Sequence, residues 1–237
     1  MQYTTLFFDL DDTLYPSSTG LWQAIRERMS IYMAERLGLA QDEIPQLRRH
    51  YFENYGTTLR GLQIHHHVDA DDYLAFVHDL PLTNYLQPRP GLRALLLSLP
   101  QPCWILTNAD ERHASRVLKI LGLTDCFTGI IDVCSIGFAC KPEEVAFHRA
   151  LALASENNPH KCILLDDSLR NLAGAQKLGF TTVLIDENGN RNNTAAPDSP
   201  HLKDSSPSIS TCQADYRVSS LFDLPEVLPM LWQTTSG

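Results

Sequence analysis

Five short apolar runs of the chain end directly at polar residues. Runs of this length without alternation are typical of strands that are buried on both faces of a sheet. The runs, each with the residue that follows it, are 6–8 before Asp9, 104–106 before Thr107, 130–131 before Asp132, 163–165 before Asp166 and 181–185 before Asp186. We therefore predict a sheet that carries polar side chains at the ends of its strands.

Helical patterns separate the later runs. Apolar residues at helical spacing predict helices over 111–122, 142–154 and 169–178. We expect Gly122 to end the first of these helices and Pro142 to open the second. Strands that alternate with helices indicate an α/β fold with a mostly parallel sheet covered on both faces. Near the end of the chain, we predict a short edge strand over 216–218 and a closing helix over 221–231.

The interval between the first two strands is far longer than the crossover of about a dozen residues that parallel strands require. It contains an apolar stripe from Leu21 to Leu37 and further helix-compatible stretches at 42–54 and 71–79. We therefore predict a small helical domain and a separate α/β core. The predicted boundaries are 16–88 for the helical cap, 1–15 with 89–237 for the core, and 187–213 for a flexible loop rich in Asn, Ser, Pro and Asp.

Composition and charge narrow the class of protein. Of the 237 residues, 43% are hydrophobic and 20% are charged, which fits a globular protein rather than a disordered or fibrous one. A net charge of -9 argues against binding to a nucleic acid polymer, whereas local cations could still attract a small anionic substrate. No apolar run approaches the ~20 residues that span a bilayer, and the first residues do not resemble a signal peptide. We expect a cytoplasmic protein with free cysteines and no membrane partner.

The strongest chemical signal is the pair Asp9 and Asp11 directly after the first predicted strand. In an open parallel sheet, ligands bind beyond the carboxyl ends of the strands. Two neighbouring carboxylates disfavour each other's ionisation unless a cation shares them, and Mg²⁺ prefers oxygen ligands. These aspartates could instead cap a turn or a helix. A calcium loop of the EF-hand type is excluded because its sixth position requires glycine, where this chain has Leu14.

Three weaker signals follow at later positions. Thr107 and Asn108 end a strand where a hydroxyl and backbone N–H groups can hold a phosphate, although threonine there is more often a turn residue. Lys141 precedes the predicted helix start, from which its ammonium could reach an anion or simply face solvent. Asp166 and Asp167 end another strand, where acids could bind a cation or begin a helix. Thr107, Asn108 and Lys141 are thus candidate phosphate-binding residues.

In this order, the four signals resemble the four motifs of the haloacid dehalogenase superfamily over nearly the whole chain. The resemblance implies a Rossmann-like core with an inserted helical cap. It further implies that Asp9 is the nucleophile, that Asp11 protonates the leaving oxygen and then activates water, and that Thr107 and Lys141 bind the transferring phosphoryl group.

The same resemblance implies a magnesium site. Its ligands would be Asp9, Asp11, Asp166 and Asp167, with Asp167 favoured as the direct ligand of the last pair and Asn171 supporting that pair. Haloacid dehalogenases themselves lack the second acid of the first motif, so Asp11 indicates phosphate chemistry on a small phosphorylated metabolite.

Several segments further resemble the pyrimidine 5'-nucleotidase branch, which hydrolyses nucleoside monophosphates such as UMP and CMP. They are 10–16, 20–29, 55–62 and 166–168. The alternatives are a phosphatase or phosphomutase for another small metabolite, and a phospho-accepting signalling module. The run His65-His66-His67 is interpreted as a solvated loop rather than a metal site, because consecutive side chains of a regular element cannot all face one ion.

Overall fold

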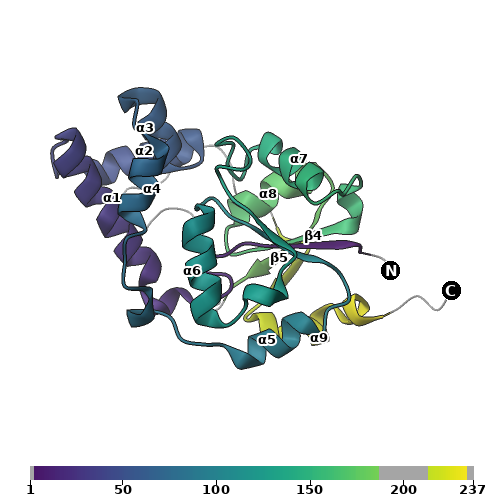
Figure 1. The fold of residues 1–237 in the computed structure, drawn as a ribbon. Helices are drawn as coiled ribbons and strands as arrows, with labels where there is room; N and C mark the ends of the chain where they lie inside the picture. The colour runs from purple at the N-terminus through teal and green to yellow at the C-terminus, as the bar shows by residue number, and fades with distance from the viewer. Residues whose placement is uncertain (1–2, 187–212, 234–237) are drawn as a thin grey trace.

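Six parallel strands form one sheet in the order β3-β2-β1-β4-β5-β6 (Figure 1). The computed structural model describes residues 3–186 and 213–233. The strands are β1 (Thr5–Phe8), β2 (Cys103–Leu106), β3 (Gly129–Ile131), β4 (Cys162–Asp166), β5 (Thr181–Ile185) and β6 (Tyr216–Val218). The α/β fold with a parallel sheet, predicted from alternating apolar runs and helical patterns, is confirmed.

The central strand β1 pairs with β2 on one side and with β4 on the other. The chain places β2 and β3 on one side of β1 and then β4, β5 and β6 on the other side. The carboxyl ends of β1 and β4 are therefore a topological switch point, where ligands bind in such sheets. Phe8 is in register with Leu165, and the N–H of Asp9 donates to the carbonyl oxygen of Leu165 at 2.9 Å. This pairing brings the polar residues that follow both strands to the same place.

Helices cover both faces of the sheet (Figure 1). Side chains alternate along β1, so that Leu6 and Phe8 pack into one hydrophobic cluster and Phe7 packs into another. The first cluster is covered by α5 (Pro90–Leu97), α6 (Glu111–Leu121) and α9 (Leu224–Val227), and the second by α7 (Glu144–Leu153) and α8 (Leu169–Lys177). Burial on both faces explains why the strands appear in the sequence as unbroken apolar runs.

Four of the helices between β1 and β2 in the chain are grouped at one end of the molecule (Figure 1). They are α1 (Leu21–Leu37), α2 (Ile44–Tyr55), α3 (Thr58–His66) and α4 (Ala70–Val77), and we refer to them as the helical insert. Most of a third hydrophobic cluster lies within them, including an edge-to-face contact of Tyr32 and Tyr73 at 5.0 Å between ring centroids. The insert thus has an apolar core of its own.

Two predicted helices were wrong in their extent. The helix expected from Pro142 begins at Glu144, because Asn108 binds both backbone groups of Lys141 and holds this segment outside the helix. The closing helix expected over 221–231 is divided into short pieces. Pro229 has no N–H to donate and restricts Leu228, whose φ of -127° and ψ of 58° are not helical.

The three consecutive histidines do not form the loop that we predicted. His65 and His66 belong to α3, and His67 is its C-cap residue. His66 Nε2 lies 2.8 Å from the hydroxyl of Tyr51, and His65 Nε2 lies 2.7 Å from that of Tyr55. The helix continues through these histidines because α2 offers them aromatic rings and hydroxyl groups.

The described part of the chain contains no helix with the length and apolar character needed to cross a lipid bilayer. Its cysteines are all free thiols, as expected, and they are Cys103, Cys126, Cys134, Cys140 and Cys162. The predicted flexible loop lies, apart from Gln213, outside the described residues.

Candidate active site

Three carboxylates converge at the carboxyl ends of β1 and β4. Asp9 follows β1, Asp166 ends β4, and Asp167 is the next residue. Each offers an oxygen, and these oxygens all lie within 4.8 Å of one another. Asp9 is 8% exposed and Asp166 is fully buried, so the carboxylates are largely removed from water. The structure therefore brings together acids that are more than 150 positions apart in the sequence.

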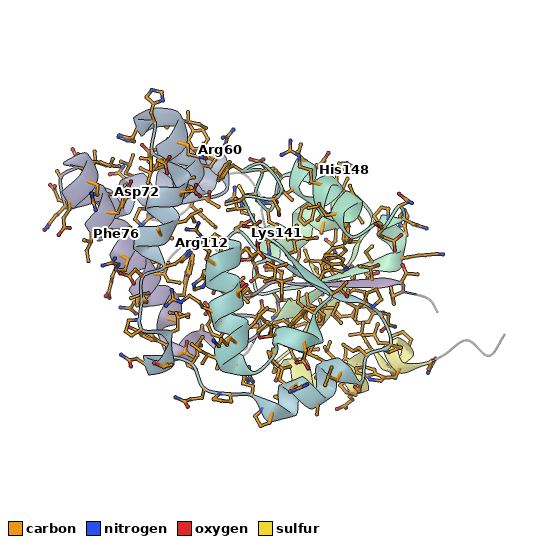
Figure 2. All side chains as sticks on the ribbon, in the orientation of Figure 1. Arg60, Asp72, Phe76, Arg112, Lys141 and His148 are labelled. Atoms are coloured by element: carbon orange, nitrogen blue, oxygen red, sulfur yellow. The ribbon has the colours of Figure 1, made fainter. Side chains whose placement is uncertain are left out.

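Lys141 lies against this group of acids and is itself buried, with 1% of its surface exposed. Its ammonium donates to Asp9 Oδ1 and to Asp166 Oδ2, both at 2.7 Å. Burial alone would lower the pKa of Lys141, but the two carboxylates outweigh this effect and raise it. The two carboxylates thus favour the charged form of the lysine. In Figure 2 Lys141 lies within the core, whereas His148 projects from the surface of α7.

The carboxylates together carry more charge than Lys141 compensates. Burial raises the pKa of Asp9 to about 7 although Lys141 opposes this, and burial together with Asp166 raises the pKa of Asp167 well above its usual value. When ionised, the three acids and the one ammonium leave two negative charges. A divalent cation with a preference for oxygen ligands would neutralise them, so these residues fit Mg²⁺.

Asp166 is fixed by neighbours in its own segment. Its Oδ1 accepts from the N–H of Ser168 at 2.8 Å, and the amide of Asn171 donates to both carboxylate oxygens at 3.1 and 3.2 Å. Asn171 lies on α8, where we predicted that it supports the acidic motif. With Lys141 added, each oxygen of Asp166 has two donors, which holds this carboxylate in one orientation.

Thr107 and Asn108 follow β2 at the same edge of the sheet. The Thr107 hydroxyl is buried and accepts from the N–H of Ala109 at 3.0 Å. Both ends of the Asn108 amide bind the backbone of Lys141, at 3.1 Å to its carbonyl oxygen and at 2.8 Å from its N–H. The Asn108 amide thus positions Lys141, whose backbone groups lack partners in regular structure, and Asn108 as a phosphate-binding residue stays a prediction.

The carboxylate of Asp11 is not part of the group of acids that could hold a metal in the described residues. The Tyr15 hydroxyl donates to its Oδ1 at 2.5 Å, and His113 Nε2 lies 3.1 Å from the same oxygen. Burial would raise the pKa of Asp11, but His113 and Tyr15 outweigh burial and lower it. These hydrogen bonds fit a carboxylate that exchanges a proton, and Asp11 as a metal ligand stays a prediction.

Sequence reasoning missed His113, although a signal for it exists. In α6, His113 lies at helical spacing from Val117 and Leu121, both of which are buried. A histidine on the buried face of an amphipathic helix needs a polar partner there. That partner is Asp11, 102 positions away in the sequence.

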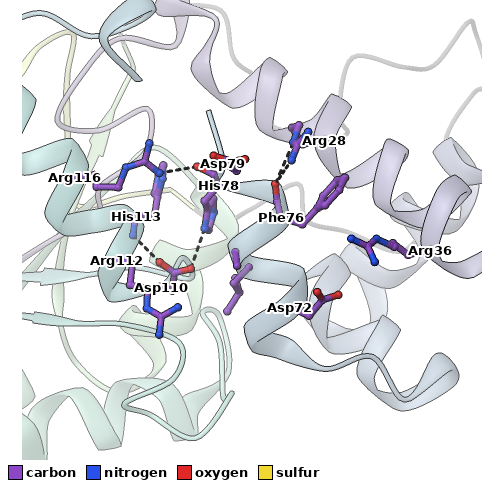
Figure 3. A pocket seen from close by; sticks show the side chains of 12 residues that line it. Arg28, Arg36, Asp72, Phe76, His78, Asp79, Asp110, Arg112, His113 and Arg116 are labelled. Atoms are coloured by element: carbon purple, nitrogen blue, oxygen red, sulfur yellow. Dashed lines mark hydrogen bonds and ion pairs between the residues drawn. The ribbon is translucent and has the colours of Figure 1, made fainter. Parts of the chain in front are cut away.

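A cavity of about 440 Å³ opens between the helical insert and α6 (Figure 3). Arg28 and Phe76 line it from the insert, and Arg112 and Arg116 line it from α6. His113 also contributes to its wall, so one imidazole contacts both the cavity and Asp11. The space between insert and core therefore adjoins the surroundings of Asp11.

Comparison with known proteins identifies similar sequences. Residues 3–179 match the model of the haloacid dehalogenase-like hydrolases. The chain is 32% identical over 193 residues to phosphate metabolism protein 8 of Saccharomyces cerevisiae, covering 75% of this chain and 60% of that protein, which is less than two thirds of its length. It is 26% identical over 190 residues to a phosphoglycolate phosphatase of Chromobacterium violaceum, covering 75% and 82% of the two chains.

Solved structures share the fold. A HAD phosphatase from Thermococcus onnurineus aligns with a TM-score of 0.60 at 20% identity over 94% of this chain and 96% of that chain. The L-2-haloacid dehalogenase from Xanthobacter autotrophicus aligns with a TM-score of 0.58 at 17% identity over 94% and 97%. At such identities, the likeness concerns the fold alone.

Proposed function

Because the chain belongs to the haloacid dehalogenase-like hydrolase family and its relatives include phosphatases, we propose that this phosphatase-type enzyme is a magnesium-dependent phosphomonoesterase with Asp9 as its nucleophile. The observation that carries the proposal is the convergence of Asp9, Asp166 and Asp167 within 4.8 Å. Lys141, which donates to Asp9 and Asp166 at 2.7 Å, adds the positive charge that an anionic ester needs.

In the first step, an oxygen of Asp9 attacks phosphorus while the bond from phosphorus to the leaving oxygen breaks. Asp11, as a carboxylic acid, gives its proton to that oxygen, which leaves as an alcohol. The products are the alcohol and an aspartyl-phosphate on Asp9. This covalent intermediate divides one difficult reaction into two easier ones.

In the second step, Asp11 acts as a carboxylate and takes a proton from water as the water oxygen attacks phosphorus. The bond between phosphorus and Asp9 breaks, which releases inorganic phosphate and restores both acids once the phosphate departs. Lys141 opposes the charge repulsion between Asp9 and the phosphate throughout. Asp9, Asp166 and Asp167 would hold Mg²⁺, whose charge, when bound, offsets the same repulsion and favours the ionised Asp9.

We further propose that residues 16–88 act as a cap that selects nucleoside monophosphates such as UMP and CMP. The resemblance of the motif segments to pyrimidine 5'-nucleotidases supports this substrate class. One of these segments contacts the core directly beside Lys141. Gly56 has a φ of +84°, a Cβ at this position would meet Cys140 Sγ at 2.5 Å, and that thiol lies 3.4 Å from the carbonyl oxygen of Tyr55.

The test is release of inorganic phosphate from a panel of monoesters in the presence of Mg²⁺. The panel contains UMP, CMP, purine nucleoside monophosphates, sugar phosphates and phosphoglycolate, the last because of the name of the C. violaceum relative. We expect the highest kcat/KM for UMP and CMP, and none for Asp9→Asn. A preference for phosphoglycolate or sugar phosphates would refute the nucleotidase assignment, and substantial turnover by Asp9→Asn would refute the role of Asp9. Isomerisation of a sugar phosphate without net phosphate release would indicate a mutase.

A further inference from the structure

Both hydrogen-bonding partners of the Asp11 carboxylate contact the same oxygen. The Tyr15 hydroxyl lies 2.5 Å from Oδ1, and His113 Nε2 lies 3.1 Å from it. Neither reaches Oδ2. An oxygen that accepts two hydrogen bonds is the carbonyl-type oxygen when a carboxylic acid is protonated, so the proton belongs on Oδ2. The two donors stabilise the ionised form of Asp11 and leave Oδ2 free to carry the proton when the group is protonated.

The tautomer of His113 follows from its two nitrogens. Nε2 faces the carboxylate, whereas Nδ1 is buried and has no hydrogen-bonding partner among the described residues. A buried N–H without an acceptor costs free energy, so we assign the proton to Nε2, which then donates to Asp11. His113 is therefore a hydrogen-bond donor that holds the carboxylate.

The His113 ring is itself held from the helical insert. His78, the C-cap residue of α4, stacks on it with ring centroids 4.2 Å apart and an interplanar angle of 21°. His78 Nδ1 lies 3.1 Å from Asp110 Oδ2, and Asp110 Oδ1 accepts from the N–H of His113 at 2.6 Å (Figure 3). From α6, Arg116 donates to the carbonyl oxygen of His78 at 2.9 Å. Both imidazoles are buried, and these contacts fix the orientation of the two rings relative to each other.

On the basis of the proposed phosphatase reaction, we propose that His113 is a positioning residue for Asp11 and that His78 positions His113. The hydrogen bond from His113 fixes Oδ1 of Asp11 and directs Oδ2 toward the leaving oxygen of the substrate. Because His78 belongs to the helical insert, efficient proton transfer also requires that the insert packs against α6. His113 and His78 touch neither substrate nor reacting atoms in this scheme.

Dependence on the leaving group tests the proposal. An ester of p-nitrophenol leaves without help from an acid, whereas an alkyl monophosphate needs its leaving oxygen protonated. The parameter kcat/KM covers the reaction only up to aspartyl-phosphate formation, so it isolates this step. General acid catalysis contributes about 10²–10⁴-fold. We expect His113→Ala to lower kcat/KM by at least roughly tenfold more for the alkyl ester than for p-nitrophenyl phosphate, within the limit set by Asp11→Ala.

Two further variants separate positioning from loss of structure. His113→Gln retains an N–H near the position of Nε2, so it should recover most of the loss seen for the alkyl ester. His78→Ala should give the same selective loss to a smaller extent. His148→Ala removes an exposed histidine of α7 and should match the wild type with both substrates. Circular dichroism and Tm identify variants that fail to fold. If His113→Ala is one of them, the selective loss on the alkyl ester in His78→Ala decides the question.

An equal loss for both esters, or no loss, in His113→Ala would overturn the proposal, and so would a loss on the alkyl ester in His113→Gln as large as that in His113→Ala. Its failure is distinguishable from failure of the proposed function. If the wild type is inactive with Mg²⁺, or if Asp9→Asn is active, the phosphatase reaction itself is wrong. If Asp11→Ala is selectively impaired on the alkyl ester while the His113 variants are not, only the role of His113 is wrong.

Discussion

Lys141→Met should lower the stability of the protein as well as abolish its activity. The substitution keeps an unbranched side chain of similar length but removes the ammonium that lies 2.7 Å from both Asp9 Oδ1 and Asp166 Oδ2. Removing one partner of a buried ion pair costs about 3–5 kcal/mol because the remaining charge stays uncompensated. Lys141 is 1% exposed, so solvent does not screen this loss. For a chain of this size, the expected decrease in Tm is roughly 6–20 °C.

The loss should also depend on pH. Burial raises the pKa of Asp9 to about 7 even with Lys141 present, and without the ammonium that pKa rises further. A carboxyl group whose pKa is raised on folding stabilises the folded state at low pH, and this contribution is lost as pH rises through the folded-state value. Lys141→Met should therefore be destabilised more at pH 8 than at pH 6.

Thermal unfolding with a chelator present, followed by circular dichroism at both pH values, measures the effect without a contribution from bound cation. Lys161→Met is the matched control, because Lys161 is exposed and its change should alter Tm very little. A decrease in Tm for Lys141→Met no larger than for Lys161→Met would refute the inference that the ammonium compensates buried charge.

Three further predictions concern the acids and the contact between insert and core. Asp167→Asn should raise Tm in chelator at pH 8, because the raised pKa of Asp167 shows that its ionised form is unfavourable in the folded state. The same variant should need a higher Mg²⁺ concentration for activity, and an unchanged Mg²⁺ requirement would exclude Asp167 as a ligand. Stabilisation by Mg²⁺ in thermal unfolding should increase from pH 6 to pH 8, since Asp9 must lose a proton with a pKa of about 7, and equal shifts at both pH values would contradict this. Arg170→Ala removes the hydrogen bonds that connect α8 to α2, at 2.6 and 2.9 Å to the carbonyl oxygens of Phe52 and Glu53. KM should rise more than kcat falls, and unchanged steady-state kinetics would exclude a role for this contact.

The sequence by itself determined the sheet and the place of its chemistry. Short unbroken apolar runs are typical of strands buried on both faces, and each run ends at the residue that the structure places at the sheet edge. Asp9, Thr107 and Asp166 were therefore assigned correctly to strand ends before their distances were known. The helical insert followed from the length of the first interval. These features depend on periodicity and spacing, which are local properties of a chain.

Only the tertiary structure decided which partners the polar groups have. Lys141 and Asp9 are 132 positions apart, and His113 and Asp11 are 102 positions apart, so no local pattern records either contact. The sequence likewise does not reveal that the backbone of Lys141 lies beside the Asn108 amide. A buried polar group must take whatever donor or acceptor the packed chain brings within about 3 Å, and that depends on how distant segments meet.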